Sequence, residues 1–297
     1  MESSAWYKNR AMTGHEFYGF AGLLTALLYL AIAALSWTQL KTEPSTDRRF
    51  GLVAALMLPA LVGHAIALGY SMFGIGGLRF GFAHALSATM LITGVLLWIE
   101  SFFVPLRGLY LLVAPIAALT VILPAFFHGA SLAAEGSSIA LRLHLGVAIL
   151  SYSILTVAAL HALLMASVDH YLHQPSADPG QGLARVFARL PPLLALESLL
   201  FRQIAVGFVL LSATVASGAV FSEELFGRPL RFDHTTAHKI VFALLSWAVF
   251  GALLAGRAVF GWRGRTALRW TFVGFVMLLL AYVGSRFVVE VILGRPG

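Results

Sequence analysis

The sequence predicts an all-α membrane protein, a bundle of about eight transmembrane helices. Hydrophobic residues make up 59% of the 297 positions and charged residues only 11%, and the mean hydropathy is +0.87. A soluble chain carries about 25% charged residues. Eight segments have the roughly 20 mostly apolar residues that a spanning helix needs. They lie at about 17–37, 52–73, 82–99, 106–124, 140–166, 201–221, 238–257 and 269–292. We expect residues 1–297 to form a single integral membrane domain.

Prolines mark the third and fourth of these segments. Pro105 lies between them, and Pro115 and Pro124 lie in the fourth. Proline frees backbone groups, but neighbouring helices can satisfy these groups in a membrane protein, so both segments still qualify as spans. No internal repeat and no regular strand alternation is visible, which excludes a transmembrane barrel and disfavours a transporter with inverted repeats.

The one substantial polar stretch is residues 167–200. It contains Gln174-Pro175-Ser176-Ala177-Asp178-Pro179-Gly180, a run that is typical of a loop. Its second half, around Leu183 to Leu194, is a candidate interfacial helix. We expect this stretch to be a cytoplasmic loop.

The distribution of lysine and arginine predicts that both termini lie outside. With the amino terminus outside, the cytoplasmic loops hold more of these residues than the outer segments, as the positive-inside rule requires. The short loop 257–269 contributes four arginines and no acidic residue. Cleavage after Ala31-Ile32-Ala33, as in a signal peptide, would invert this arrangement and is therefore disfavoured. A bacterial-type inner membrane is the expected location.

The chain has no cysteine. This excludes disulfides, thiolate metal sites, thiol catalysis and thioether attachment of haem to this chain. The net charge of +7 resides in the loops. There it is explained by the orientation of the chain in the membrane and by contact with anionic lipid, so we expect no binding of nucleic acid.

The ten histidines are unevenly distributed across the predicted membrane. Ionisable side chains inside a membrane are costly and commonly functional. The helix directions place seven histidines in the outer half: His15, His64, His84, His128, His144, His234 and His238. Only His161, His170 and His173 lie toward the cytoplasm.

His144 and His238 lie at similar depth on different predicted helices. Imidazole is an axial ligand of haem iron, and two facing helices can supply one ring on each side. We therefore predict haem-iron ligation by His144 and His238, with His64 as a further cofactor-binding residue and His84, His128 and His234 as secondary candidates. The alternative for a lone intramembrane histidine is a hydrogen bond across helices, and for His234 and His238 a solvated helix start.

A two-haem cytochrome that carries electrons across the membrane is disfavoured. Such a protein needs one histidine pair near each face, and the inner half offers His161 alone among its helices. His144 and His161 are about 25 Å apart along one helix, so they cannot bind the same iron.

Four basic residues near the outer side are candidate partners for haem propionates. They are Arg79, Arg142, Lys239 and Arg286. Arg286 has a favoured alternative, because Glu290 follows one turn later and can form an i,i+4 ion pair with it.

Several short motifs resemble the cytochrome c assembly family, of the CcsA, CcmC and HemX type. The segment Leu143-His144-Leu145-Gly146-Val147-Ala148-Ile149-Leu150-Ser151-Tyr152 is similar to that family's histidine helix. Leu199 to Phe208 and Ala216-Ser217-Gly218-Ala219-Val220 resemble its next helix. His238 to Trp247, followed by Gly261-Trp262-Arg263-Gly264-Arg265, resembles the last two helices and their basic loop. The match is best over residues 140–290.

The resemblance implies an eight-helix bundle that binds or exports haem during c-type cytochrome maturation, with His144 as an outer haem ligand. Haem-delivering members carry a tryptophan-rich outer motif after the Ser-Gly-Ala-Val segment, whereas this chain has no tryptophan between Trp98 and Trp247. They also carry an outer histidine after the last helix, which is absent here. These departures point to the shorter HemX/YpjD-like branch, in which His64, His144 and His238 are expected to matter.

Two functions follow as hypotheses. The first is a haem-handling protein of cytochrome c biogenesis that holds one non-covalent, b-type haem near the outer face, with lipid and another membrane protein as partners. The alternative is a HemX-like regulatory or scaffolding protein that does not handle haem. The chain contains no GxSxG, Walker or HExxH motif, so we expect no enzyme activity, and no complete haem ligase.

Overall fold

The computed structural model describes most of the chain as long helices. The described residues are 2–41, 47–73, 78–104, 107–132, 139–172, 193–220 and 234–292. Within them, eight helices are long and apolar enough to cross a membrane. These helices are α1 (Glu2–Lys41), α2 (Asp47–Met72), α3 (Phe82–Glu100), α4 (Arg107–Phe126), α5 (Ile139–Leu172), α7 (Leu193–Val220), α9 (His234–Phe260) and α10 (Gly264–Leu279). The predicted all-α membrane bundle is confirmed.

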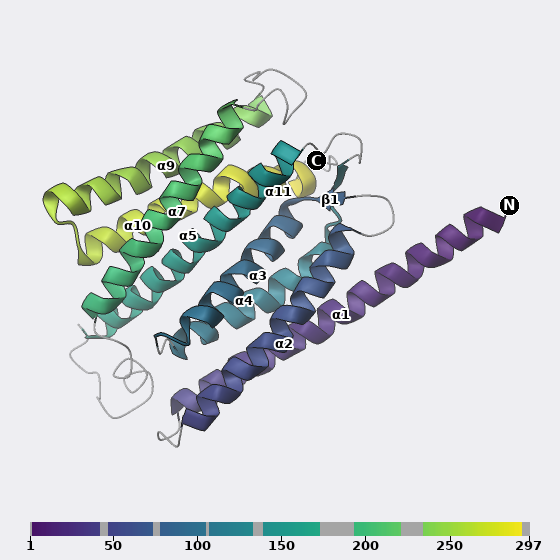
Figure 1. Ribbon diagram of the computed structural model, residues 1–297, viewed down its shortest axis with the longest axis horizontal. Coiled ribbons are helices and arrows are strands. Elements are labelled where there is room, and N and C mark those ends of the chain that lie inside the picture. The colour runs from purple at the N-terminus through teal and green to yellow at the C-terminus, as the bar shows by residue number, and fades with distance from the viewer. Residues whose placement is uncertain are drawn as a thin grey trace.

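Successive helices run in opposite directions, so the bundle has two distinct ends (Figure 1). We call one the strand end, because it carries the short strands β1 (Leu78–Phe80) and β2 (Ala130–Leu132). We call the other the arginine end, because the turn from α9 to α10 lies there with Arg257, Arg263 and Arg265. The helices form two groups: α1 to α4 on one side, and α5, α7, α9 and α10 on the other.

The central helix α5 joins the two groups. It packs against α3 and α4 on one side and α7 and α10 on the other. Three consecutive side chains of α5 donate hydrogen bonds to backbone carbonyls of three helices. The bonds run from Ser151 to Gly207 (3.1 Å) and from Tyr152 to Leu278 (2.9 Å), while Ser153 shares its proton between Ile149 of its own helix (2.7 Å) and Thr89 of α3 (3.2 Å). Such bonds between helices contribute directly to association inside a membrane, where lipid removes most of the hydrophobic driving force.

The prolines of the fourth predicted span do not interrupt it. Pro115 and Pro124 both lie inside α4, and Pro59 lies inside α2. α4 packs against α1, α2, α3 and α5, and this setting permits proline in a membrane helix.

Two helices extend further into the predicted polar stretch than hydropathy indicated. α5 continues to Leu172, beyond the expected end near 166, and α7 begins at Leu193 instead of near 201. The early start of α7 places Glu197 in the helix, where arginines neutralise it. The expected interfacial helix falls mainly on residues 173–192, which lie outside the described residues.

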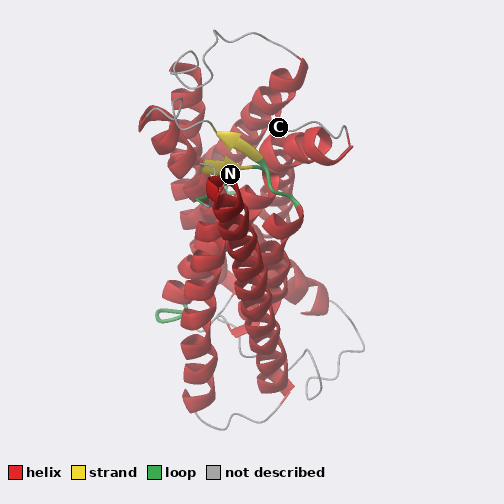
Figure 2. Cartoon of the chain, turned by 90° about the vertical axis from the view of Figure 1, so that its right-hand side faces the viewer, coloured by secondary structure: helices red, strands yellow, loops and turns green. Residues whose placement is uncertain are grey.

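The strand pair was not expected from the sequence. β1 and β2 run antiparallel, with Phe80 opposite Ala130 (Figure 2). Gly129 precedes β2 with a φ of 64°, and a Cβ there would lie 2.8 Å from the carbonyl carbon of Phe80. A residue without a side chain is required at this turn, since both the backbone conformation and the space exclude others.

The last predicted span is not a uniform α-helix. α10 is followed by the π-helical segment η2 (Leu280–Gly284), the short α11 (Ser285–Phe287) and a second π-helical segment, η3 (Val288–Ile292). Single π-turns occur frequently at functional sites. Here η2 and α11 form the part of the last span that contacts β1 and the start of α3, through Tyr282 and Phe287.

Candidate functional site

His144 lies in the second turn of α5, near the strand end, and is partly buried. Its Nδ1 lies 2.8 Å from the hydroxyl oxygen of Ser217 on α7. The ring also lies beside Gly218 of α7, where an added Cβ would be 3.5 Å from its Cε1. The Ala216–Val220 motif and the histidine helix therefore meet in space.

The direction of this hydrogen bond follows from the partner of Ser217. The Ser217 hydroxyl donates its single proton to the carbonyl of Thr214, at 3.0 Å. With its proton directed at Thr214, Ser217 accepts from His144, and in this arrangement the Nδ1 of His144 carries the ring proton. The other nitrogen, Nε2, consequently carries the lone pair in the neutral ring. This is the arrangement in which a hydrogen-bonded partner orients a histidine for iron or another metal.

His64 lies fully buried on α2, and both of its ring nitrogens are engaged. Nδ1 lies 3.2 Å from the hydroxyl of Tyr29 on α1, and Nε2 lies 2.9 Å from the hydroxyl of Ser87 on α3. The Tyr29 and His64 rings also meet edge to face, with centroids 5.7 Å apart. His64 thus joins three helices and offers no unbound nitrogen in this conformation.

His84 is fully buried at the start of α3. Its Nε2 lies 2.9 Å from the hydroxyl of Ser71 on α2, and its Nδ1 makes no hydrogen bond. His128 and Arg79 are near enough to interact with it electrostatically. These three residues lie together beside the strand pair, and of them only Arg79 carries a fixed positive charge.

His238 lies in the second turn of α9 with an exposed side chain. α9 and α5 both pack against α7, but among the described side chains no hydrogen bond or ring contact joins His238 to His144. The side chains of His234 and His15 lie outside the described residues. The pairing of His144 with His238 stays a prediction.

The four predicted propionate partners lie at the strand end. Arg142 is exposed on α5, two residues before His144, and Lys239 follows His238 on α9. Arg79 belongs to β1. Arg286 lies on α11, with its guanidinium carbon 6.0 Å from the ring centre of Tyr282. Its expected ion pair involves Glu290, whose side chain lies outside the described residues.

Aromatic side chains surround this end of the last helix. Phe80 of β1 contacts Tyr282 at 6.1 Å between ring centres. Phe82 of α3 contacts both Phe127 at 4.9 Å and Phe287 at 5.5 Å. These contacts attach the π-helical end of the chain to the first group of helices.

The two described histidines toward the arginine end, His161 and His170, do not pair with each other. His161 is fully buried on α5, His170 is exposed near the end of the same helix, and His173 lies outside the described residues. Within the described ranges, no three His, Asp or Glu side chains cluster closely enough to hold a metal ion.

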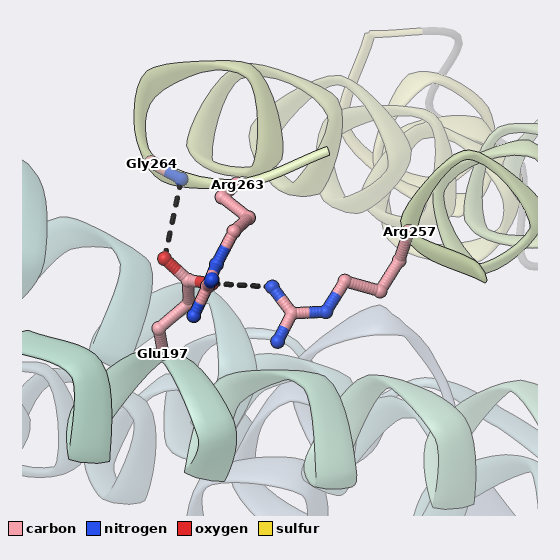
Figure 3. Close-up of polar contacts among 4 residues, drawn as sticks. All are labelled: Glu197, Arg257, Arg263 and Gly264. Atoms are coloured by element: carbon pink, nitrogen blue, oxygen red, sulfur yellow. Dashed lines mark hydrogen bonds and ion pairs between the residues drawn. The ribbon is translucent and has the colours of Figure 1, made fainter. Parts of the chain in front are cut away.

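The arginine end is held together by the carboxylate of Glu197 on α7 (Figure 3). Arg257 of α9 donates to its Oε1, and the Nε of Arg263 donates to the same oxygen at 2.9 Å. The backbone N–H of Gly264, where α10 begins, donates to Oε2 at 3.3 Å. The Arg257 guanidinium also stacks on Phe201, 4.3 Å from the ring centre. One buried carboxylate therefore joins the ends of three helices.

Sequence reasoning assigned no role to Ser217 or Glu197. Ser217 was visible only within a matching motif, and its contact with His144 spans 73 residues of chain. Glu197 falls in the polar stretch 167–200 that the sequence predicts to be a loop. An acidic residue within a hydrophobic run, facing a short loop of unpaired arginines, was the signal available for it.

Comparison with known proteins gives matches over almost the whole chain. A family model described as "Cytochrome C assembly protein" matches residues 20–293. The inner membrane protein YpjD of Escherichia coli strain K12 is 30% identical over 275 residues, covering 91% of this chain and 98% of YpjD. The cytochrome c biogenesis protein CcsA of Synechococcus sp. strain CC9605 is 32% identical over 159 residues, covering 48% of this chain and 51% of CcsA. No solved structure matches the chain.

Proposed function

Because the chain belongs to the cytochrome c assembly protein family, we propose that it is a haem-handling protein of cytochrome c biogenesis in a bacterial inner membrane. His144 and His238 would hold one non-covalent, b-type haem at the strand end. Haem supplies the ligand-binding and redox chemistry of its iron. The protein's residues bind it, orient it and limit its contact with water.

The observation that carries this proposal is the sequence of hydrogen bonds from His144 to Ser217 to Thr214. In this series, the Nδ1 of His144 donates a hydrogen bond, and its Nε2 keeps the lone pair that binding to iron requires. Arg142 lies two residues before His144 and Lys239 directly follows His238, so both supply positive charge for the propionates. The proposed haem ligands do not include His64, because its two ring nitrogens are hydrogen-bonded to side chains of α1 and α3.

The test is the absorption spectrum of full-length protein purified from haem-replete cells. We expect a bis-histidine haem spectrum in the wild type and its loss in His144→Ala and in His238→Ala. The matched control is His170→Ala, an exposed histidine at the opposite end of α5. A wild-type protein with no Soret band after haem supplementation would contradict the proposal.

The proposal includes no haem ligase activity. The family's tryptophan-rich outer motif is absent between Trp98 and Trp247, and so is a histidine after the last helix. We place the chain with the shorter HemX/YpjD-like members, in agreement with its full-length match to YpjD.

The alternative is a regulatory or scaffolding protein that does not handle haem. The hydrogen bonds of His64 favour it, because they give one membrane histidine a purely structural role. This alternative predicts that His144→Ala keeps its function in cells, whereas disruption of the Glu197 contacts abolishes it. A complementation assay with these two variants distinguishes the two functions.

A further inference from the structure

A buried group of polar side chains lies toward the arginine end, away from the haem site proposed above. It consists of Glu100, the last residue of α3, His161 of α5 and Gln203 of α7. The Nε2 of His161 lies 3.6 Å from the Oε1 of Glu100. The amide nitrogen of Gln203 donates to that same oxygen at 3.1 Å. Three helices therefore converge on one carboxyl oxygen.

The protonation of His161 follows from its own helix. Its Nδ1 lies 2.9 Å from the carbonyl oxygen of Val157, one turn earlier. A carbonyl only accepts hydrogen bonds, so Nδ1 carries a proton. In the neutral ring, Nε2 then carries a lone pair, and it is buried without a hydrogen bond.

Two hydrogen-bond acceptors consequently face each other if Glu100 is ionised and His161 is neutral. Buried acceptors without a donor are unfavourable, and so is an ionised carboxylate without a cation at membrane depth. Among the described residues, no lysine or arginine contacts Glu100. A single proton removes both problems, because it cancels the charge and gives one of the two facing atoms a hydrogen to direct at the other across 3.6 Å.

The charged groups described nearby do not compensate the charge of Glu100 in place of this proton. Glu197 of α7 is occupied by two arginines, and Asp169 of α5 binds Arg265 of α10 at 2.8 Å. On α4, which packs against α3 and α5, the described titratable group is the neutral phenol of Tyr110. Arg202 of α7 is exposed.

We propose that Glu100 and His161 form an intramembrane proton-binding site, in which one proton is held between the carboxyl group and the ring Nε2. Uptake of the proton changes the charge of the pair from −1 to 0. The side chain of His161 is 0% exposed and that of Glu100 is 14% exposed. Glu100 therefore connects the site to the arginine end, and the proton enters from there.

Infrared spectroscopy of the full-length protein in lipid nanodiscs at about pH 7 tests the proposal, since free carboxyl and imidazole groups would both be deprotonated there. We expect a protonated-carboxyl band that is lost in Glu100→Gln, or an imidazolium band that is lost in His161→Gln. The control is Glu197→Gln, which removes an ionised-carboxylate band and leaves the signal of the pair unchanged.

His161→Gln provides a second readout that does not depend on the Glu100 variant folding. Its amide can still donate to the carboxyl group, so the helices remain joined, while the shared proton is lost. We expect the Glu100 band to shift in frequency. A wild-type spectrum with ionised Glu100 and neutral His161 together would overturn the proposal, and so would a Glu100 band unchanged by His161→Gln. Neither readout depends on haem.

Discussion

At the residue scale, the orientation of His144 depends on a hydroxyl of a different helix. Ser217 directs its proton to Thr214 and its lone pair to His144. The hydroxyl therefore selects the ring tautomer and fixes the plane of the ring. Partners of this kind commonly change metal affinity without contacting the metal.

Ser217→Ala removes this partner and leaves His144 in place. We expect haem affinity to fall by roughly 10–100-fold, the range typical for such a partner, with little change in the unfolding midpoint. Ser217→Thr keeps the hydroxyl and should restore binding. Haem titration followed by absorbance measures the effect.

The matched control for Ser217 is Ser167→Ala. Ser167 also bonds to a carbonyl of its own helix, that of Leu163 at 2.8 Å, but it lies near the other end of α5. Equal losses of haem affinity in the two variants would show that Ser217 has no specific effect on His144.

His64 illustrates the opposite case, a membrane histidine that serves to join helices. His64→Ala leaves the hydroxyls of Tyr29 and Ser87 without this partner inside the bundle. We expect the free energy of unfolding to fall by about 1–3 kcal/mol, the cost of an unsatisfied buried polar group. Denaturation in mixed micelles measures this change.

The haem spectrum of His64→Ala separates structure from ligation. We expect the Soret band to remain in the part of the protein that stays folded. Loss of haem at unchanged stability would instead return His64 to the ligand set.

At the element scale, the carboxylate of Glu197 determines how α7, α9 and α10 meet. Its side chain is 8% exposed, whereas those of Arg257 and Arg263 are 30% and 56% exposed. Water therefore screens the arginines but hardly reaches the carboxylate. The contribution of these ion pairs to the stability of the protein therefore lies between that of a surface ion pair and that of a fully buried one.

Glu197→Gln leaves two arginines near a neutral amide. We expect a loss of about 1–3 kcal/mol in stability, reduced from the fully buried case by solvent screening. Faster hydrogen exchange in residues 257–264 should accompany it, because their contacts with α7 weaken. Hydrogen–deuterium exchange with mass spectrometry measures the local effect.

Asp169→Asn is the control for an exposed pair at the same end. Arg265 is 62% exposed and Asp169 is 30% exposed. The free energy of unfolding of Asp169→Asn should differ from that of the wild type by less than about 1 kcal/mol. If Asp169→Asn destabilises the protein as much as Glu197→Gln, the specific role of Glu197 is incorrect.

At the scale of the whole molecule, the direction of the chain across the membrane decides on which side each site lies. The distribution of basic residues leads us to propose that both termini and the strand end face outward. The haem site would then face outward, and the proton site would open toward the cytoplasm.

The absence of cysteine makes this orientation directly measurable. Thr266→Cys introduces a thiol at the exposed start of α10, and Ser222→Cys introduces one two positions along the chain from Val220, where α7 ends at the strand end. In intact cells without an outer-membrane barrier, an impermeant maleimide should label Ser222→Cys at once. Thr266→Cys should require permeabilisation, and the reverse pattern would invert the proposed orientation.

The sequence by itself determined the fold class and the eight spans. Both depend on composition and on runs of apolar residues, which are local properties. Since apolar side chains in a membrane favour helices whose backbone bonds are internally satisfied, hydropathy predicted the helices. Polar residues also caused the error in one boundary, because the span predicted from about 201 excluded Glu197, whereas α7 begins at Leu193.

Only the tertiary structure decided which polar residues meet. His64 and His144 look alike in the sequence, yet one has both nitrogens occupied and the other keeps a lone pair. The Glu100–His161 pair joins residues 61 positions apart, 161 minus 100, on different helices. Hydrogen bonds and close polar pairs depend on distances of up to about 4 Å, and the packing of helices, which no local pattern encodes, fixes those distances.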